Sequence, residues 1–390
     1  MGVAVSVREV CPICDTRTPS AFLQRDGAPV HQNLLFDNPD DARAIARGTL
    51  ALAACPTCGF VYNRAFDASL LAYGERYENT QDCSPAFAVH VRLLADEIVR
   101  AAPEDARIVE IGCGKGSFLR ALVDAAPGAR AVGFDPSYVG DESDRDGRLR
   151  FERRFFDESA DPGPVDVVIC RHVIEHVADP AALLGLLRRT LDDSPGARLY
   201  FETPCVEWIL RNRVIWDVFY EHCSYFSAGS LAFAFERAGF IVAGVRRVFA
   251  GQYLWLEAVP ATSHRAYAPT PGAVPELAHA FAQDYDPLVD RWRQTAQTAA
   301  AHGKVAVWGA GAKGVTFANV VDPDGSMLDC AIDLNPNKQG RFTPGTGLPI
   351  VEPSVAALRG VRSALLMNPN YARENADLLA AAQLPIELIT

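Results

Sequence analysis

The sequence has no surplus of positive charge and no long apolar run. Its 390 residues carry a formal net charge of −11 at pH 7, which argues against nucleic acid or an anionic membrane as the main partner. No apolar run approaches the length of a transmembrane helix, and the N-terminus lacks the charged segment and apolar core of a secretion signal. We therefore expect a cytoplasmic protein, either a monomer or a small homo-oligomer, that binds neither of these partners.

Cysteine is also not distributed as it is in a disulfide framework. Six of the ten cysteines are scattered singly, and the other four form Cys11-Pro-Ile-Cys14 and Cys55-Pro-Thr-Cys58. Each Cys-x-x-Cys turn directs two thiolates to one point, and two such turns make the closed four-sulfur site of structural zinc. We expect Cys11, Cys14, Cys55 and Cys58 to hold Zn²⁺ in a domain over residues 1–80. A redox pair and free cysteines are the alternatives.

An unusual glycine turn follows the first clear strand. The apolar run 107–111 contains Glu110 and leads through Gly112, Gly114 and Gly116 into a predicted helix over 116–126. The dinucleotide motif has a longer last gap, so this spacing does not indicate a pyrophosphate. S-adenosylmethionine has no phosphate; it needs a close backbone approach and a carboxylate near its cationic end, which Glu110 supplies directly or through water. A glycine-rich turn in an unrelated α/β domain is the alternative.

Strands and helices alternate from residue 107 to residue 202, which predicts a doubly wound parallel sheet in an α/β fold. Asp135 ends the second strand, 130–134, and is placed to bind ribose hydroxyls. Ligands of such sheets bind outside the carboxyl ends of the strands. We therefore expect these residues to bind the cofactor: Glu110, Gly112, Gly114, Gly116, Phe118, Asp135, Pro136, Arg171 and His172.

The densest polar cluster lies at 216–227 and includes Glu221 and His222 among aromatic residues. An adjacent Glu and His are costly to bury without a function, and they suit a base whose pKa is set by its neighbour. A structural His–Glu pair is the alternative. Tyr73 and Tyr77 lie one helical turn apart, and they form either a packing edge or a lid over a ligand.

A second glycine turn lies near the C-terminus, after a linker over 261–275 and a predicted helix over 276–302. Gly309, Gly311 and Gly314 have the dinucleotide spacing, and Asp333 follows nineteen residues after Gly314. Taken alone this predicts NAD, but a helix N-terminus binds the diphosphate of a nucleotide sugar equally well. Lys313 and Lys338 add positive charge. We expect a small Rossmann-like domain here.

These three blocks, in this order, resemble the sugar C-methyltransferase family over nearly the whole chain. The resemblance implies an N-terminal zinc-binding domain over 1–80, a class I S-adenosylmethionine-dependent methyltransferase core with a Rossmann-like fold over 81–260, and a linker helix with a C-terminal Rossmann-like substrate-binding domain over 261–390. Family members methylate a carbon next to a ketone in a nucleotide-linked 4-keto-6-deoxy sugar, in deoxysugar and antibiotic biosynthesis. The substrate lies between the core and the C-terminal domain.

The catalytic Tyr-x-Glu-His segment of the family falls on Phe219 to His222, and its histidine after the fourth strand falls on His176. Phe219 lacks the tyrosine hydroxyl, and Tyr220 is the next residue; the stretch 250–255 also lacks the usual Gly-Gly and arginine. The resemblance thus implies a base, His222, oriented or tuned by Glu221, with His176 and Tyr220 as donors to an enolate oxygen. The expected substrate-binding residues are Tyr77, Gly311, Lys313, Asp333 and Lys338.

Two other functions stay open at this point. An O- or N-methyltransferase acting on another small molecule could use the same glycine turn and the same histidine base. A non-catalytic protein that binds nucleotide sugars would keep the zinc site and the C-terminal domain without needing Glu221 and His222.

Overall fold

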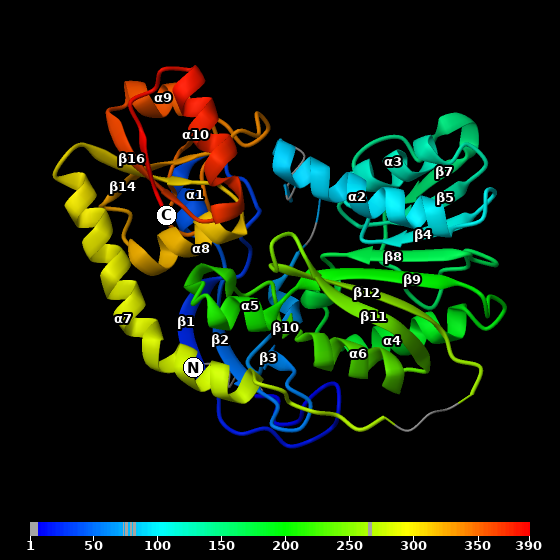
Figure 1. Cartoon of the computed structure of the whole chain (residues 1–390). Coiled ribbons are helices and arrows are strands. Elements are labelled where there is room, and N and C mark those ends of the chain that lie inside the picture. Colours follow the sequence, from blue (N-terminus) through cyan, green and yellow to red (C-terminus); the bar gives the residue numbers. More distant parts are fainter. Residues whose placement is uncertain (1–6, 73, 75–76, 79, 81–82, 264–266) are drawn as a thin grey trace.

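Three β-sheets organise the chain in the computed structural model, which describes residues 7–72, 74, 77, 78, 80, 83–263 and 267–390 (Figure 1). Tyr73, one half of the proposed lid, lies outside the described residues. Tyr77 forms an isolated β-bridge with Leu34 and is not part of a helix, so the helical relation expected between the two tyrosines does not hold at Tyr77.

The central sheet has the strand order β11-β12-β9-β8-β4-β5-β7-β6. Its strands are β4 (Arg107–Ile111), β5 (Arg130–Phe134), β6 (Ser143–Asp144), β7 (Leu149–Glu152), β8 (Val167–Arg171), β9 (Arg198–Pro204), β11 (Phe240–Val248) and β12 (Tyr253–Pro260). The strands from β9 to β7 are parallel to their neighbours, and β12, β11 and β6 add antiparallel edges. The predicted doubly wound α/β sheet is confirmed.

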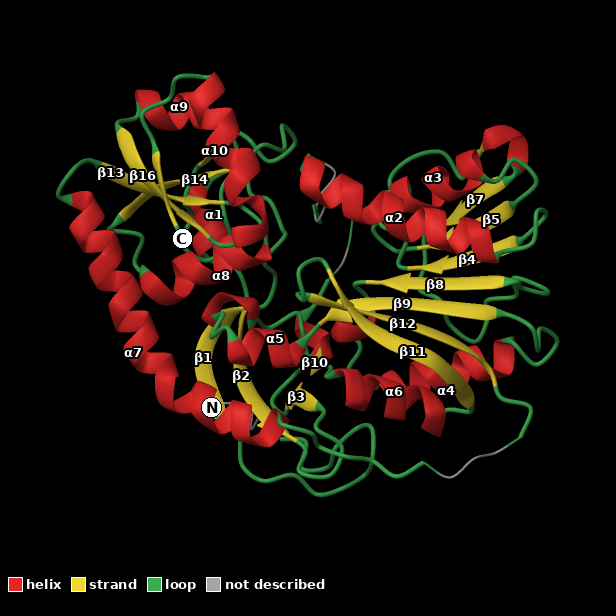
Figure 2. Cartoon of the chain, viewed as in Figure 1, coloured by secondary structure: helices red, strands yellow, loops and turns green. Residues whose placement is uncertain are grey.

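Helices cover both faces of this sheet because successive side chains of each strand point to opposite faces. The helices α2 (Pro85–Ala101) and α3 (Ser117–Ala125) cover one face, and α4 (Pro180–Thr190) and α6 (Ala228–Arg237) cover the other (Figure 2). On β9, Tyr200 packs in the core under α2 and α3, and its neighbour Phe201 packs in the core under α4 and α6.

The N-terminal sheet recruits a strand from the middle of the chain. Its order is β1 (Leu23–Pro29), β2 (Arg47–Ala54), β3 (Val61–Asn63) and β10 (Ser224–Tyr225). The strand β10 pairs with β3 directly after the Glu221–His222 segment. The candidate catalytic segment is therefore held by the N-terminal sheet, which local sequence patterns do not reveal.

The C-terminal sheet is fully parallel, with the order β15-β14-β13-β16-β17. Its strands and helices are β13 (Lys304–Trp308), α8 (Ala312–Val321), β14 (Leu328–Ile332), β15 (Ile350–Val351), α9 (Pro353–Leu358), β16 (Val361–Leu366), α10 (Ala372–Ala381) and β17 (Glu387–Ile389). The long helix α7 (Val274–Ala300) connects it to the rest of the chain (Figure 1).

One apolar core joins the N-terminal and the C-terminal sheets. It contains Leu52 of β2, Phe281 of α7, Phe317 of α8 and Trp216. Trp216 belongs to the 3-10 helix η4 (Ile215–Asp217), and its indole N–H donates to the carbonyl of Met367 at 2.9 Å. The remaining short helices are α1 (Pro39–Arg43), η1 (Ala68–Leu70), η2 (Arg145–Gly147), η3 (Ile174–His176), α5 (Val206–Arg211) and η5 (Pro369–Tyr371). Among the described residues, no helix combines the length and the apolar character that crossing a membrane requires.

Gly314 offers a test of how the second glycine turn packs. A Cβ added to Gly314 would lie 1.8 Å from the carbonyl oxygen of Gly309, whereas one added to Gly244 would have nothing within 4 Å. We expect G314A to lower the free energy of unfolding by about 1–3 kcal/mol, and G244A to leave it nearly unchanged. Denaturant unfolding of both variants measures this, and equal stability would contradict the observed packing.

Candidate active site

Two cavities open where the parallel strands end. The first, of about 230 Å³, lies at the ends of β4, β5 and β8, and we name it the β4 cavity. The second, of about 270 Å³, lies between the central and the C-terminal sheet, and we name it the interdomain cavity. Their linings share Tyr77, Thr80, His172 and His176, so the two cavities adjoin each other at these residues.

The glycine turn after β4 needs its glycines. Gly112, Gly114 and Gly116 have φ values of 71°, 54° and 78°, which favour glycine. A Cβ at Gly112 would meet a methyl group of Val173 at 2.1 Å. The amide of Gly114 donates to a carboxylate oxygen of Asp135 at 2.8 Å, so Asp135 fixes the turn in addition to lining the cavity.

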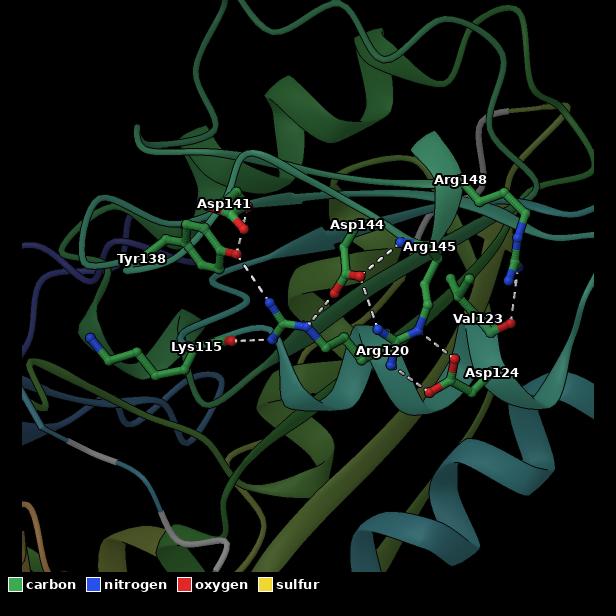
Figure 3. Close-up of polar contacts among 9 residues, drawn as sticks. All are labelled: Lys115, Arg120, Val123, Asp124, Tyr138, Asp141, Asp144, Arg145 and Arg148. Atoms are coloured by element: carbon green, nitrogen blue, oxygen red, sulfur yellow. Dashed lines mark hydrogen bonds and ion pairs between the residues drawn. The ribbon is translucent and has the colours of Figure 1, made fainter.

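Arg120, on α3, fastens the far end of the turn (Figure 3). Its guanidinium donates to the carbonyl of Lys115 at 2.7 Å, to Asp144 at 2.8 Å and to the Tyr138 hydroxyl at 3.1 Å. Asp144 in turn pairs with Arg145 at 2.9 Å. The turn is thus held by contacts with the β6–β7 edge of the sheet.

The carboxyl group of Glu110 is buried in the wall of the β4 cavity and can pair with a cation. It is 2% exposed, and its Oε2 has no hydrogen-bond partner among the described residues. Burial raises the pKa of Glu110 to about 8, a shift that nearby Arg171 opposes and Asp135 adds to. A buried, unsatisfied carboxyl beside an open glycine turn fits the cationic end of S-adenosylmethionine. Of the predicted cofactor residues, all line this cavity except Gly116.

Glu202, at the end of β9, collects three basic side chains. His90 of α2 binds it at 2.5 Å, Arg171 at 2.9 Å, and the His172 ring lies 3.4 Å away. Burial alone would raise the pKa of Glu202, but the charges of Arg171 and His172 outweigh it and hold that pKa well below its usual range. A further acid, Glu175, lies 3.4 Å from the other nitrogen of His172.

His222 and His176 face the interdomain cavity together. Their ring centres are 4.7 Å apart, and Phe219 packs on His222 with ring centres 4.0 Å apart. The Nδ1 of His222 has no hydrogen-bond partner among the described residues. Burial, helped by the neighbouring charges of His176, His172 and Lys313, holds the pKa of His222 well below its usual value. His222 is therefore neutral at pH 7 and able to accept a proton.

The structure corrects the predicted role of Glu221. Its carboxylate does not contact His222; it accepts a hydrogen bond from Nδ1 of His31 at 2.8 Å and from the backbone amide of Gln32 at 2.9 Å. The Nε2 of His31 accepts the amide of Ala72 at 2.9 Å, so the proton of His31 is on Nδ1. Glu221 thus fastens the candidate catalytic segment to the N-terminal part.

Tyr220 also differs from its predicted role, because it is not part of the cavity lining. Its hydroxyl accepts the amide of Asp67 at 2.9 Å and donates to the carbonyl of the same residue at 3.3 Å. Tyr220 is fully buried, so it does not supply the hydroxyl that Phe219 lacks. Phe219 and His222 line the cavity, whereas the two residues between them turn to the N-terminal part of the chain.

The predicted substrate residues Tyr77, Gly311, Lys313, Asp333 and Lys338 all line the interdomain cavity. The two lysines, however, already have partners. Lys313 donates to Asp217 at 2.7 Å, and the ammonium of Lys338 lies 3.5 Å from Asp333. Asp333 accepts the amide of Ala310 at 2.8 Å, and so fixes the second glycine turn. The positive charge expected from the lysines is therefore largely balanced.

Several site residues escaped the sequence analysis. Asp217 and Glu175 lie close to predicted residues in the same polar segments of the sequence. That position could have indicated them as site residues. His31 and the pair of Gln252 with Asn368, whose amides bind each other at 2.7 and 3.2 Å, gave no local sign because their partners are far away in the sequence.

The four paired cysteines come together as predicted. Sγ atoms are 3.7 Å apart between Cys11 and Cys58 and 3.4 Å apart between Cys14 and Cys55, and all four lie within 4.8 Å of one another. None of the ten cysteines forms a disulfide. Four sulfurs placed 2.3 Å from a central ion would be about 3.8 Å apart, so this cluster fits a tetrahedral metal site.

Known proteins match the chain in two segments and along its length. A methyltransferase domain family matches residues 87–243, and a C-methyltransferase C-terminal domain family matches residues 274–382. The C-methyltransferase NovU of Streptomyces niveus is 27% identical over 392 residues, which cover 94% of this chain and 91% of that protein. A ubiquinone biosynthesis O-methyltransferase of Methylococcus capsulatus is 34% identical over 105 residues, covering 25% of this chain and 43% of that protein. Among solved structures, CalO1, a methyltransferase in calicheamicin biosynthesis, is 19% identical with a TM-score of 0.35, and covers 43% of this chain and 54% of its own.

The matched core and the geometry of the β4 cavity define the class of protein. The chain is an S-adenosylmethionine-dependent methyltransferase of class I. Its C-terminal segment matches the C-methyltransferase C-terminal domain, and a C-methyltransferase aligns along almost the entire chain.

The raised pKa of Glu110 predicts how cofactor binding depends on pH. The ionised carboxyl attracts the cationic cofactor, and its fraction grows as the pH rises toward the pKa of about 8. The affinity for S-adenosylmethionine should therefore increase from about pH 6 through pH 8 and level off only above about pH 9. E110Q should bind about tenfold or more weakly and lose that part of the pH dependence. Calorimetric titration at several pH values tests this, and a pH dependence identical in both proteins would assign it to the cofactor itself.

Proposed function

We propose that this chain transfers a methyl group to the carbon next to the ketone of a nucleotide-linked keto-deoxy sugar. The observation that carries the proposal is the junction of the two cavities at His172 and His176. An acceptor in the interdomain cavity can present a carbon there to a cofactor in the β4 cavity. Bound S-adenosylmethionine supplies the electrophilic methyl group, and the side chains of this protein must prepare and position the carbon.

His222 is the proposed base. It is buried and neutral, and it lies on the wall of the interdomain cavity beside His176. It accepts the proton from the carbon next to the ketone, and a negative charge developing on the ketone oxygen stabilises the imidazolium that results. Glu221, through His31 and Gln32, holds the backbone of His222 in place.

The nucleotide diphosphate has a proposed place at the N-terminus of α8. The turn Gly309–Gly311 leaves the first amides of this ten-residue helix without a side-chain cap, and such an end attracts phosphate. Because Lys313 and Lys338 are balanced by Asp217 and Asp333, the helix end is the principal attraction for an anion in this part of the cavity. We further propose the three domains 1–80, 81–260 and 261–390, and a cytoplasmic location in keeping with cysteines that form no disulfide.

An O- or N-methyltransferase is the second candidate. Phe219 favours it, because this ring packs against the proposed base and carries no hydroxyl for an enolate. A hydroxyl or amine acceptor would need the base and no stabilised enolate. The mass and the carbon-13 methyl shift of the product separate attachment to carbon from attachment to oxygen or nitrogen.

We propose that the metal of the four-cysteine site is zinc with a structural role. All four positions are thiolates, so no coordination position is open for chemistry. We expect about one zinc ion per chain by elemental analysis. C55S should lose the metal and lower the melting temperature by at least about 5 °C. The control is C83S, at an exposed cysteine outside the cluster, and a metal-free wild-type protein of unchanged stability would refute the proposal.

The proposed base is tested with H222N. Methyl transfer to a nucleotide-linked 4-keto-6-deoxy sugar should fall by about 10²–10⁴-fold, because proton removal loses its acceptor. S-adenosylmethionine should bind as in the wild type, since His222 lies outside the β4 cavity lining. The control is H302N, an exposed histidine after α7. Near-normal turnover of H222N would exclude His222 as the base.

A further inference from the structure

A carbon acid needs a group that stabilises its enolate oxygen, and of the two donors expected here, Tyr220 and His176, only His176 lines the interdomain cavity. This inference rests on the proposed function, in which a carbon next to a ketone loses its proton. Phe219 has no hydroxyl, and the Tyr220 hydroxyl is bound to Asp67 away from the cavity. With Tyr220 excluded, a further positive or donor group is needed beside His176 near the reacting carbon.

His172 has the required position. It lines the β4 cavity and the interdomain cavity, so it lies where the methyl group must pass from one to the other. Its backbone has a φ of 54°, in the left-handed region that L residues rarely adopt. The amide of His172 donates to the carbonyl of Glu202 at 2.8 Å, and Tyr253 packs edge-on against the ring with centres 4.6 Å apart. The surrounding structure thus fixes this conformation.

His172 also has the required charge. Its Nδ1 lies 3.4 Å from Glu175 and its Nε2 lies 3.4 Å from Glu202. Burial alone would lower the pKa of His172, but the charge of Glu202 and the contacts with both acids outweigh it and raise the pKa to about 9. The side chain is 24% exposed, and Nε2 has no hydrogen bond of good geometry among the described residues.

The other cations of the interdomain cavity are engaged more closely. Lys313 donates to Asp217 at 2.7 Å and to Gln252 at 3.3 Å. Lys338 is buried next to Asp333 and the carbonyl of Ala310. Neither lysine lines the β4 cavity. Of these three cations, His172 alone lines both cavities.

We propose that the His172 imidazolium stabilises the enolate oxygen during methyl transfer. His222 takes the proton of the carbon next to the ketone, and the electron pair of that C–H bond moves onto the ketone oxygen beside His172. The carbon then forms its bond to the methyl group as the sulfur–methyl bond breaks. The ketone is restored, and His222 releases its proton to water. Glu175 and Glu202 keep His172 charged and oriented.

Enolate formation can be measured without methyl transfer. The probe is dTDP-4-keto-6-deoxyglucose in D₂O with S-adenosylhomocysteine, and proton NMR follows deuterium entry next to the ketone. H172N removes the charge and keeps the backbone, because asparagine tolerates left-handed φ values. We expect H172N to slow this exchange by about 100-fold when both proteins are saturated with S-adenosylhomocysteine, so that any change in cofactor affinity is separated from the loss of charge.

A second variant separates charge from structure. H172G keeps the backbone and leaves a space, and added imidazole should restore part of its exchange rate, which a purely structural role does not explain. Wild-type exchange in H172N, or weaker cofactor binding with unchanged exchange, would overturn the role of His172. A wild-type enzyme that neither exchanges nor methylates the probe would instead refute the proposed function, and the role of His172 with it.

Discussion

The buried carboxylate of Glu202 imposes the strongest constraint on this molecule. A carboxylate without exposure costs several kcal/mol unless it is paired and hydrogen-bonded. Its partners come from three places: His90 from α2, Arg171 from the end of β8, and His172 from the residue after it. Satisfying this charge therefore positions the helix over the sheet, orients an arginine in the β4 cavity, and holds a histidine in a conformation that it would not adopt alone.

The segment 216–225, which contains the proposed base His222, is held in place by residues that are distant in the sequence. The indole of Trp216 binds Met367, the carboxylate of Asp217 binds Lys313, and the carboxylate of Glu221 binds His31. The C-terminal sheet thus holds one end of the segment and the N-terminal sheet holds the other. His222 is left facing the cavity with a nitrogen that has no hydrogen-bond partner in the described part of the chain, and the contacts of its neighbours hold the segment rigid.

The sequence predicted those features that are local in the chain. The glycine turns, the strands before them and the two Cys-x-x-Cys motifs follow from spacing within a few residues, and the structure has them at those positions. The pairing of β10 with β3, the bond between Glu221 and His31, and the engagement of both lysines are contacts between distant segments. Residue spacing does not encode such contacts. The adjacency of Glu221 and His222 in the sequence was therefore mistaken for a contact between their side chains, and the two lysines were mistaken for unpaired positive charges.

The two glycine turns are built in the same way. Their shared motif therefore determines the shape of the turn but not which ligand the turn binds. In each, the aspartate after the next strand accepts an amide of the turn at 2.8 Å, Asp135 from Gly114 and Asp333 from Ala310. Each aspartate also accepts the amide two residues further on, at 2.7 and 2.9 Å. The glycines and the acid nineteen residues later thus specify the shape of a turn. Selection between ligands must come from what faces the turn: an unpaired buried acid, Glu110, attracts a cation at the first, while the uncapped end of α8 suits an anion at the second.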